Sequence, residues 1–202
     1  MSRQLVTGLL VAAAVACASL AAASVPDPAT SSVSWGGPFN GACTFPVICP
    51  RGGASPDIVA TINVIVRDQF GSPMGGIGAS EVEATGTCIL GGGSPCGLVI
   101  NVLANAATAG DGSTTISISK AGSCCADLQV RARGTTLNTL SYRSYDYTGD
   151  LRCDLSDLGF LAQTFNLSQG QGGYNACFDF DCNNKVDLSD LGFFAPHFNH
   201  IC

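Results

Sequence analysis

The C-terminal third of the chain contains one acidic segment twice, and this duplication constrains the fold of the region more than any other feature. The segment Cys153–Phe160 reads CDLSDLGF and recurs as VDLSDLGF at Val186–Phe193, 33 residues later. Residues with oxygen-bearing side chains precede both copies at the same offset: Asp146, Thr148 and Asp150 in the first, and Asp179, Asp181 and Asn183 in the second. The sequence therefore predicts two units of the same local structure.

The spacing of these residues is that of a calcium-binding loop. Ca²⁺ takes six to eight oxygen ligands, which a tightly wound loop supplies from alternate side chains, one backbone carbonyl, a water-mediated contact and a final two-oxygen carboxylate. We therefore expect two calcium ions as cofactors. The ligands expected in the first loop are Asp146, Thr148, Asp150, the carbonyl of Arg152, Asp154 and Asp157; those of the second are Asp179, Asp181, Asn183, the carbonyl of Lys185, Asp187 and Asp190.

The sixth residue of the loop distinguishes the two copies. Calcium loops normally carry glycine there, because the chain turns through a left-handed conformation. The second copy has Asn184, which tolerates this conformation, whereas the first has Leu151, which adopts it only at a cost. We expect calcium to bind more strongly at 179–190 than at 146–157.

Each copy changes to a helical spacing of apolar residues after its ninth position. Asp154 and Asp187 are favourable N-caps, each with a second aspartate three residues on. No helical pattern precedes either loop, so each unit is a loop followed by a helix, or half an EF-hand. The eighth residue is apolar, Cys153 or Val186, and we expect the two loops to pair there and bury it.

The segments DYTGDLRCDLSDL and DFDCNNKVDLSDL resemble the pattern D-x-N-x-D-G-x-V-x-x-x-D-L of the dockerin type I domain. This resemblance covers about 145–202 and implies a calcium-stabilised module that docks onto a cohesin domain. Dockerins often carry a hydroxyl pair at positions 10 and 11 for cohesin recognition, where this chain has Leu155-Ser156 and Leu188-Ser189. Both copies differ in the same way, so the partner surface is expected to keep its pseudo-twofold character with altered specificity. The alternative partner is the chain's own N-terminal domain.

The region 25–140 alternates short strand-like runs with glycine, proline and serine. Ile62, Val64 and Val66 fall on one face of a period-two run. Similar runs occur at 81–90, 98–103, 114–119 and 128–133, and this spacing predicts an all-β sandwich. The segments ATINVIVRDQFGSPMGG and GDGSTTISISKAG resemble bacterial immunoglobulin-like domains of adhesins and surface proteins, which implies a structural or spacer role. The expected fold is an immunoglobulin-like sandwich, 25–140, followed by a small α domain of two calcium-loop-helix repeats, 141–202.

Residues 1–24 have the features of a secretory signal peptide: Arg3, the apolar run 5–16 and small residues through Ala23. We expect a secreted protein, extracellular or at the cell surface, without a transmembrane segment. A lipid anchor through Cys17 is the alternative, because the residues before it loosely resemble a lipobox.

Ten cysteines follow the signal peptide, and an even number in an exported chain predicts disulfides. Six lie before residue 141 and four after it, which favours bridges within each region. The expected pairs are Cys88–Cys96, Cys43 and Cys49 with Cys124 and Cys125 in either order, Cys177–Cys202, and Cys153–Cys182.

The distribution of charge and the missing motifs exclude several functions. The net charge of −6 argues against a nucleic-acid binder that relies on phosphate neutralisation. The chain has no G-x-S-x-G motif, and neither histidine has a credible nucleophile partner. We expect a non-catalytic protein whose docking module serves extracellular or cell-surface protein assembly. The alternatives are a carbohydrate-binding or adhesive module, with Trp35 and Phe39 as its sugar-stacking surface, and an accessory component of polysaccharide breakdown.

Overall fold

A computed structural model of the chain describes residues 24–37, 39–48, 60–89, 95–118, 126–150 and 152–201. The expected signal peptide lies almost wholly outside this part. Leu151 and five of the cysteines also lie outside it: Cys17, Cys49, Cys124, Cys125 and Cys202.

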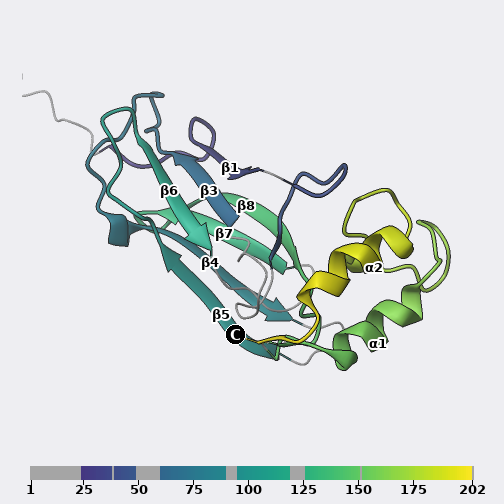
Figure 1. Cartoon of the computed structure of the whole chain (residues 1–202). Coiled ribbons are helices and arrows are strands. Elements are labelled where there is room, and N and C mark those ends of the chain that lie inside the picture. Colours follow the sequence, from purple (N-terminus) through teal and green to yellow (C-terminus); the bar gives the residue numbers. More distant parts are fainter. Residues whose placement is uncertain are drawn as a thin grey trace, which may run out of the picture.

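Two β-sheets make up the N-terminal part of the described chain (Figure 1). The three-stranded sheet has the order β1 (Ser32–Gly36), β3 (Ala60–Ile65), β6 (Ser113–Ile118) and is antiparallel. The five-stranded sheet has the order β2 (Val47–Ile48), β8 (Thr135–Ser144), β7 (Ala126–Ala132), β4 (Val82–Ile89), β5 (Pro95–Leu103). Within it only β2 and β8 run parallel. A short 3₁₀ turn, η1 (Ala79–Glu81), leads into β4.

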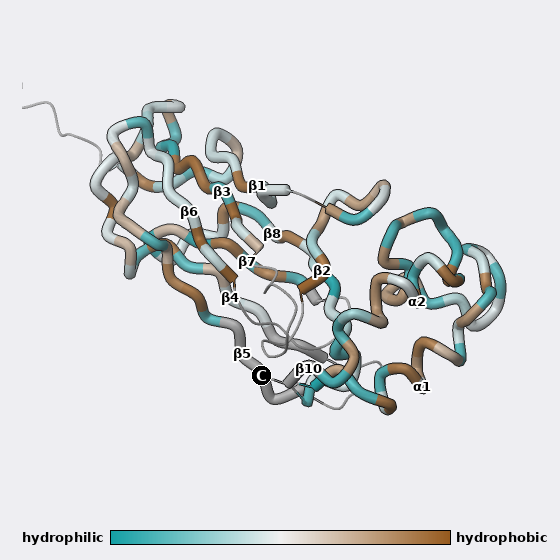
Figure 2. The backbone as a smooth tube through the Cα atoms, in the orientation of Figure 1, coloured by the Kyte–Doolittle hydropathy of each residue, from teal (hydrophilic) through white to brown (hydrophobic). Residues whose placement is uncertain are grey.

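The alternation of apolar and polar residues explains why these sheets face each other. In β3, Ile62 and Val64 are fully buried while Asn63 between them is exposed, as a period of two requires. Their side chains meet Leu128 and Val130 of β7 in one hydrophobic core. Figure 2 shows the same pattern as hydrophobic stretches along β3 and β7. The two layers form the β-sandwich expected from the sequence.

Strand β8 carries the chain from the sandwich into the C-terminal region. The domain boundary was expected within this segment, near residue 141, but β8 continues without a break to Ser144. Tyr142 packs in the core of the sandwich, and Tyr145, three residues on, packs in a second core. The two regions are therefore joined by a strand rather than by a linker.

The C-terminal region holds two α-helices at one end of the sandwich (Figure 1). Its elements are β9 (Arg152–Cys153), α1 (Leu155–Thr164), η2 (Ala176–Phe178), α2 (Leu188–Phe194), η3 (Ala195–His197) and β10 (His200–Ile201). Each α-helix begins directly after an acidic segment, as the sequence pattern predicts. Among the described residues, no helix is both long and apolar enough to cross a bilayer.

The two repeats are held together by exchanged backbone contacts. After α1, the N–H of Asn166 donates to the carbonyl of Val186 at 2.6 Å; after α2, the N–H of Asn199 donates to that of Cys153 at 2.7 Å. Cys153 and Val186 are both fully buried, as expected for the eighth loop position. They do not pair with each other, however, because each loop pairs with the segment that follows the other repeat's helix.

The second hydrophobic core lies beneath the two helices and is rich in aromatic rings. Tyr145 is at its centre, with its ring 4.8 Å from that of Phe180 and stacked 4.3 Å from that of His197. Leu161 of α1 and Phe194 of α2 pack into the same core, each only 1% exposed. Both repeats thus share one core.

Candidate functional site

Three carboxylates of the second loop converge in space. One oxygen from each of Asp179, Asp181 and Asp190 lies within 4.8 Å of the others, although Asp190 is eleven residues from Asp179 in sequence. Asp179 and Asp190 are buried and Asp181 is half-buried. They stand at positions 1, 3 and 12 of the loop, so the fold assembles half of the expected ligand set.

Backbone hydrogen bonds fix the positions of the buried pair. Asp190 is the third residue of α2 and accepts N–H groups from Phe180 at 2.6 Å and from Asp187 at 2.8 Å. Asp179 accepts the N–H groups of Asn183 and Asn184, both at 3.0 Å. The backbone of the loop is therefore wound around its own carboxylates.

Burial and the negative charge of neighbouring carboxylates make ionisation of Asp181 and of Asp190 less favourable. Burial raises the pKa of Asp190 and the pKa of Asp181, and the negative charge of Asp179 adds to both. Burial and the hydrogen bond of 2.8 Å to Asp179 raise the pKa of Tyr174 to about 12. A divalent cation among these carboxylates would offset their repulsion, and oxygen donors of this kind are those that calcium prefers.

Of the other residues expected at the second site, Asn183 lies beside the three carboxylates and Asp187 lies at the start of α2. The side-chain amide of Asn183 donates to Asp181 at 3.1 Å, which places it beside the cluster. Asp187 instead caps α2 by accepting the N–H of Ser189 at 2.9 Å, and it forms an ion pair with Lys185 at 3.4 Å. Among the described groups, Asp187 is thus engaged at the helix start rather than in the cluster.

The first loop reproduces this framework, and it too carries four aspartates. Asp157 is fully buried and accepts N–H groups from Thr148 at 2.9 Å and from Asp154 at 2.8 Å. Burial raises the pKa of Asp157, as it does for its counterpart in the second loop. Asp146 is fully buried as well and accepts from Thr148 and from the N–H of Asp150 at 3.2 and 3.3 Å.

Two differences separate the first loop from the second. Its third position is a threonine, and within the described part of the chain only the second loop gathers three carboxylates. The remaining contacts are alike: Asp154 caps α1 as Asp187 caps α2, and Asp150 accepts the N–H of Arg152 as Asn183 accepts that of Lys185. In the second loop Asn184 adopts the expected left-handed conformation, with φ of 70°. Leu151, its counterpart, lies outside the described residues.

Two equivalent leucines are exposed at the starts of the helices. Leu155 and Leu188 are each the first residue of their helix, and each side chain is 73% exposed. An apolar pocket of about 260 Å³ lies between the helices, lined by Leu158, Leu191, Phe194, Ala195 and Phe198. The repeat thus leaves matched apolar side chains on the surface.

A disulfide joins the N-terminal region to the second loop, contrary to the expected pairing. Cys43 is bonded to Cys182, across 139 residues of sequence. The pairs Cys153–Cys182 and Cys43 with Cys124 or Cys125 are therefore wrong, because the expectation confined every bridge to one region. Cys177 also forms a disulfide, and its expected partner Cys202 lies outside the described residues. The side chains of Cys88 and Cys96 lie outside the described part as well.

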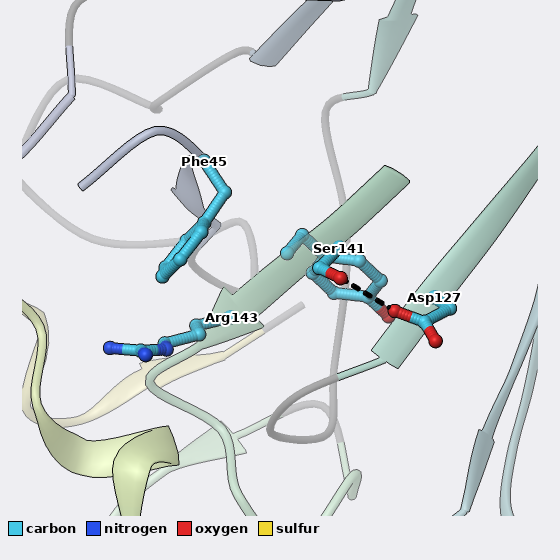
Figure 3. A pocket seen from close by; sticks show the side chains of 5 residues that line it. Phe45, Asp127, Ser141 and Arg143 are labelled. Atoms are coloured by element: carbon cyan, nitrogen blue, oxygen red, sulfur yellow. Dashed lines mark hydrogen bonds between the residues drawn. The ribbon is translucent and has the colours of Figure 1, made fainter. Parts of the chain in front are cut away.

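A pocket of about 380 Å³ lies beside this connection (Figure 3). It is lined by Phe45, Asp127, Ser141, Tyr142 and Arg143. The Ser141 hydroxyl donates to Asp127 at 2.7 Å, and the Arg143 guanidinium lies 4.4 Å from the centre of the Phe45 ring. The chain thus presents an acid, a cation and an aromatic ring around one cavity, a set that sequence spacing did not reveal.

Trp35 does not form the sugar-stacking surface that the sequence suggested. Its side chain is only 9% exposed and packs in the core of the sandwich, with Phe39 against that core. The indole N–H donates to the carbonyl of Ser141 at 2.8 Å. Trp35 therefore ties β1 to β8 and offers no open ring face.

Comparison with known proteins identifies no family. No protein-family model matches the chain, and no curated protein matches its sequence. Among solved structures, the filamin domain of Lin-41 is similar, with 21% identity, 58% of this chain and 96% of that chain covered, and a TM-score of 0.33.

Two mutant type II cohesin–X-dockerin complexes from Acetivibrio cellulolyticus are also similar. The C-terminal interface mutant has 17% identity, with 61% of this chain and 86% of that chain covered, and a TM-score of 0.28. The N-terminal interface mutant has 16% identity, with 63% and 94% covered, and a TM-score of 0.29. At such low TM-scores these neighbours establish neither a family nor a partner.

Proposed function

We propose that this chain is an exported, non-catalytic assembly protein in which a calcium-stabilised, dockerin-like module is carried by an immunoglobulin-like sandwich. The convergence of Asp179, Asp181 and Asp190 carries the proposal. Carboxylates held this close by their own backbone repel one another unless a cation joins them. The repeated spacing supports calcium as that cation, since its loops use these positions.

Calcium would supply charge neutralisation and rigidity. Asp179, Asp181, Asn183, Asp190 and the carbonyl of Lys185 would hold the ion in the second loop. An ion that binds only the folded form stabilises it by RT ln(1 + [L]/Kd), about 2.7 kcal/mol at a hundredfold excess over Kd. Because Asp190 also lies in the first turn of α2, ordering the loop would order the start of that helix.

Thermal unfolding in calcium and in a chelator tests this role. The full chain should melt at a higher temperature in calcium, and Asp181→Ala should lose most of the gain that the second loop provides. Asp111→Ala is a matched control, since Asp111 is an acid in a turn of the sandwich, remote in sequence from both loops. An equal melting temperature with and without calcium would reject the calcium site.

The docking surface that we propose consists of Leu155 and Leu188 and the helix starts around them. Exposed leucines in equivalent places on two related helices give a partner matched apolar side chains to bury, which is favourable. The partner that fits the resemblance is a cohesin-like domain. The repeat would offer it two similar faces related by a pseudo-twofold rotation.

Binding to immobilised cohesin domains tests the surface. The double variant Leu155→Ser/Leu188→Ser should lose binding, and calcium removal should weaken it. Phe70→Ser is the matched control, because Phe70 is an exposed apolar residue of the sandwich at 75% exposure. Binding that survives the double variant, or that fails with every cohesin tried in calcium, would count against this partner.

The pocket beside Phe45 favours a second candidate function, carbohydrate binding. An aromatic ring with a carboxylate and a guanidinium nearby can contact a sugar through its apolar face and its hydroxyl groups. A glycan array with the full chain is the test, followed by Phe45→Ala and Asp127→Asn. Binding that both substitutions leave intact would exclude this pocket, and binding to cohesin without glycan binding would favour the docking function. Glycan binding in the context of assembly would fit an accessory role in polysaccharide breakdown.

A further inference from the structure

The segment 39–48, which we call the strap, reaches from the sandwich to the second loop. Its Cys43 is bonded to Cys182, which stands between two of the proposed calcium ligands, Asp181 and Asn183. The N–H of Ala42 donates to the carbonyl of Asp181 at 2.8 Å. The strap therefore holds the backbone of the proposed site by a covalent bond and a hydrogen bond at neighbouring residues.

Gly41 allows the strap to come this close. It has φ of 50°, and a Cβ atom there would overlap the carbonyl oxygen of Asp181 and lie 2.8 Å from its Cβ. Any larger residue would push the strap away from the second loop. The contact is thus specific to the residue present at position 41.

The repeat itself shows what the strap does for the second loop. Cys182 has a left-handed conformation with φ of 59°, and its counterpart in the first loop is Gly149 with φ of 74°. Glycine adopts this conformation freely, whereas a residue with a Cβ pays for it and needs support from its surroundings. The strap provides that support through Cys43, and Arg143 adds a contact of 3.7 Å to the Cys182 sulfur.

We propose that the strap positions the second loop for calcium, so that the Cys43–Cys182 disulfide and the bound ion stabilise each other. This inference rests on the proposed calcium site. Coupling between two sites is reciprocal and typically changes affinity five- to 150-fold. Loss of the disulfide should therefore weaken calcium binding at the second loop, by about tenfold. Calcium should in turn make the disulfide harder to reduce by the same factor.

Isothermal titration of the full chain with calcium tests the effect of the disulfide on calcium binding. Asp150→Ala removes a ligand of the first loop, so that the second loop is titrated as the intact site. Asn183→Ala removes a ligand of the second loop, so that the first is titrated as the intact site. Adding Cys43→Ser/Cys182→Ser should weaken the second loop about tenfold and leave the first loop unchanged within about twofold. If the second loop binds calcium with equal affinity with and without the disulfide, the coupling is overturned but the calcium site is not. Absence of calcium binding in the unsubstituted chain overturns both this proposal and the calcium site.

Two glycine variants keep the test valid if the cysteine variant does not fold. Gly41→Ala should also weaken the second loop, because it displaces the strap while both cysteines remain. Gly71→Ala is the matched control, since Gly71 has a similar positive φ of 77° but nothing within 4 Å of an added Cβ. Equal calcium affinity in the two variants would overturn the proposed role of the strap.

A glutathione redox buffer tests the reverse direction. Two glutathione thiols become one glutathione disulfide as Cys43–Cys182 becomes two thiols, and alkylation with peptide mass spectrometry measures the reduced fraction. Calcium should shift this equilibrium toward the disulfide by about the factor found by titration. Magnesium is the control ion, because it requires a tighter octahedral site. An equilibrium that calcium leaves unchanged overturns the reciprocal coupling.

Discussion

At the scale of single residues, Asp68 shows how the sandwich holds a carboxylate by hydrogen bonds. Its side chain is buried, accepts N–H groups from Phe70 and Ser72 at 2.9 Å and accepts the hydroxyl of Ser24 at 2.7 Å. The hydrogen bond from Ser24, which removal of residues 1–24 would take away, and those from Ser72 and Phe70, which would remain, hold the pKa of Asp68 below its ordinary value. The ionised form is therefore favoured by folding.

A pH series of melting temperatures checks this assignment. Because the folded-state pKa of Asp68 is lowered, its contribution is present above the unfolded-state value of about 4 and is lost as pH falls through the folded-state value. Asp68→Asn should melt below the unsubstituted chain at neutral pH, and the difference should shrink in acid. A difference that stays constant, or that grows in acid, would contradict the assignment.

Asn184 provides the second test at this scale. It has φ of 70°, and its N–H donates to Asp179 at 3.0 Å, so a residue that resists this conformation disturbs the proposed site directly. Asn184→Leu copies the residue of the first loop and should lower the free energy of unfolding by about 1–2 kcal/mol. Asn184→Gly should stay within about 0.5 kcal/mol of the unsubstituted chain. Urea unfolding in a chelator measures both, and equal losses would show that conformation is not the cause.

At the scale of elements, the start of α1 allows the contribution of helix capping to stability to be measured apart from that of metal binding. Asp154 accepts the N–H of Ser156 at 2.8 Å, while Asp157 accepts that of Asp154, which forms a capping box. Asp154→Ala should lower the free energy of unfolding without calcium by about 1 kcal/mol, and Asp154→Ser should restore most of it. Urea unfolding in a chelator measures the difference. A serine variant no better than alanine would mean that Asp154 contributes by another route.

The strands and helices show what the sequence could predict. Periods of two gave β3, β4, β6 and β7 close to their observed bounds, and the repeat predicted α1 and α2 with their aspartate caps. Strand β8 was not predicted, because its exposed Asn138 and Thr139 interrupt the apolar pattern that marks a strand. The Cys43–Cys182 bond could not be predicted, since an even number of cysteines in each region gives no sign of a crossing pair.

At the scale of the whole molecule, the strap places neighbouring residues in different cores. Val47 is 3% exposed and packs with Tyr145 and Phe180 beneath the helices, whereas Ile48 is fully buried in the sandwich. Strand β2, which contains both, pairs in parallel with the last residues of β8. The sandwich and the C-terminal region are therefore linked by packing as well as by the disulfide, and we expect them to unfold together.

Calorimetry of two adjacent substitutions tests this coupling. Val47→Ala removes packing from the C-terminal core and should cost about 1–3 kcal/mol, and Ile48→Ala, the matched control, should cost about 2–5 kcal/mol in the sandwich. If the two regions unfold as one unit, both variants should shift a single transition to lower temperature. If they are independent, Val47→Ala should lower only one of two separate transitions. That second result would also weaken the case that the strap transmits stability to the second loop, because a strap that leaves the regions independent cannot hold the loop in place.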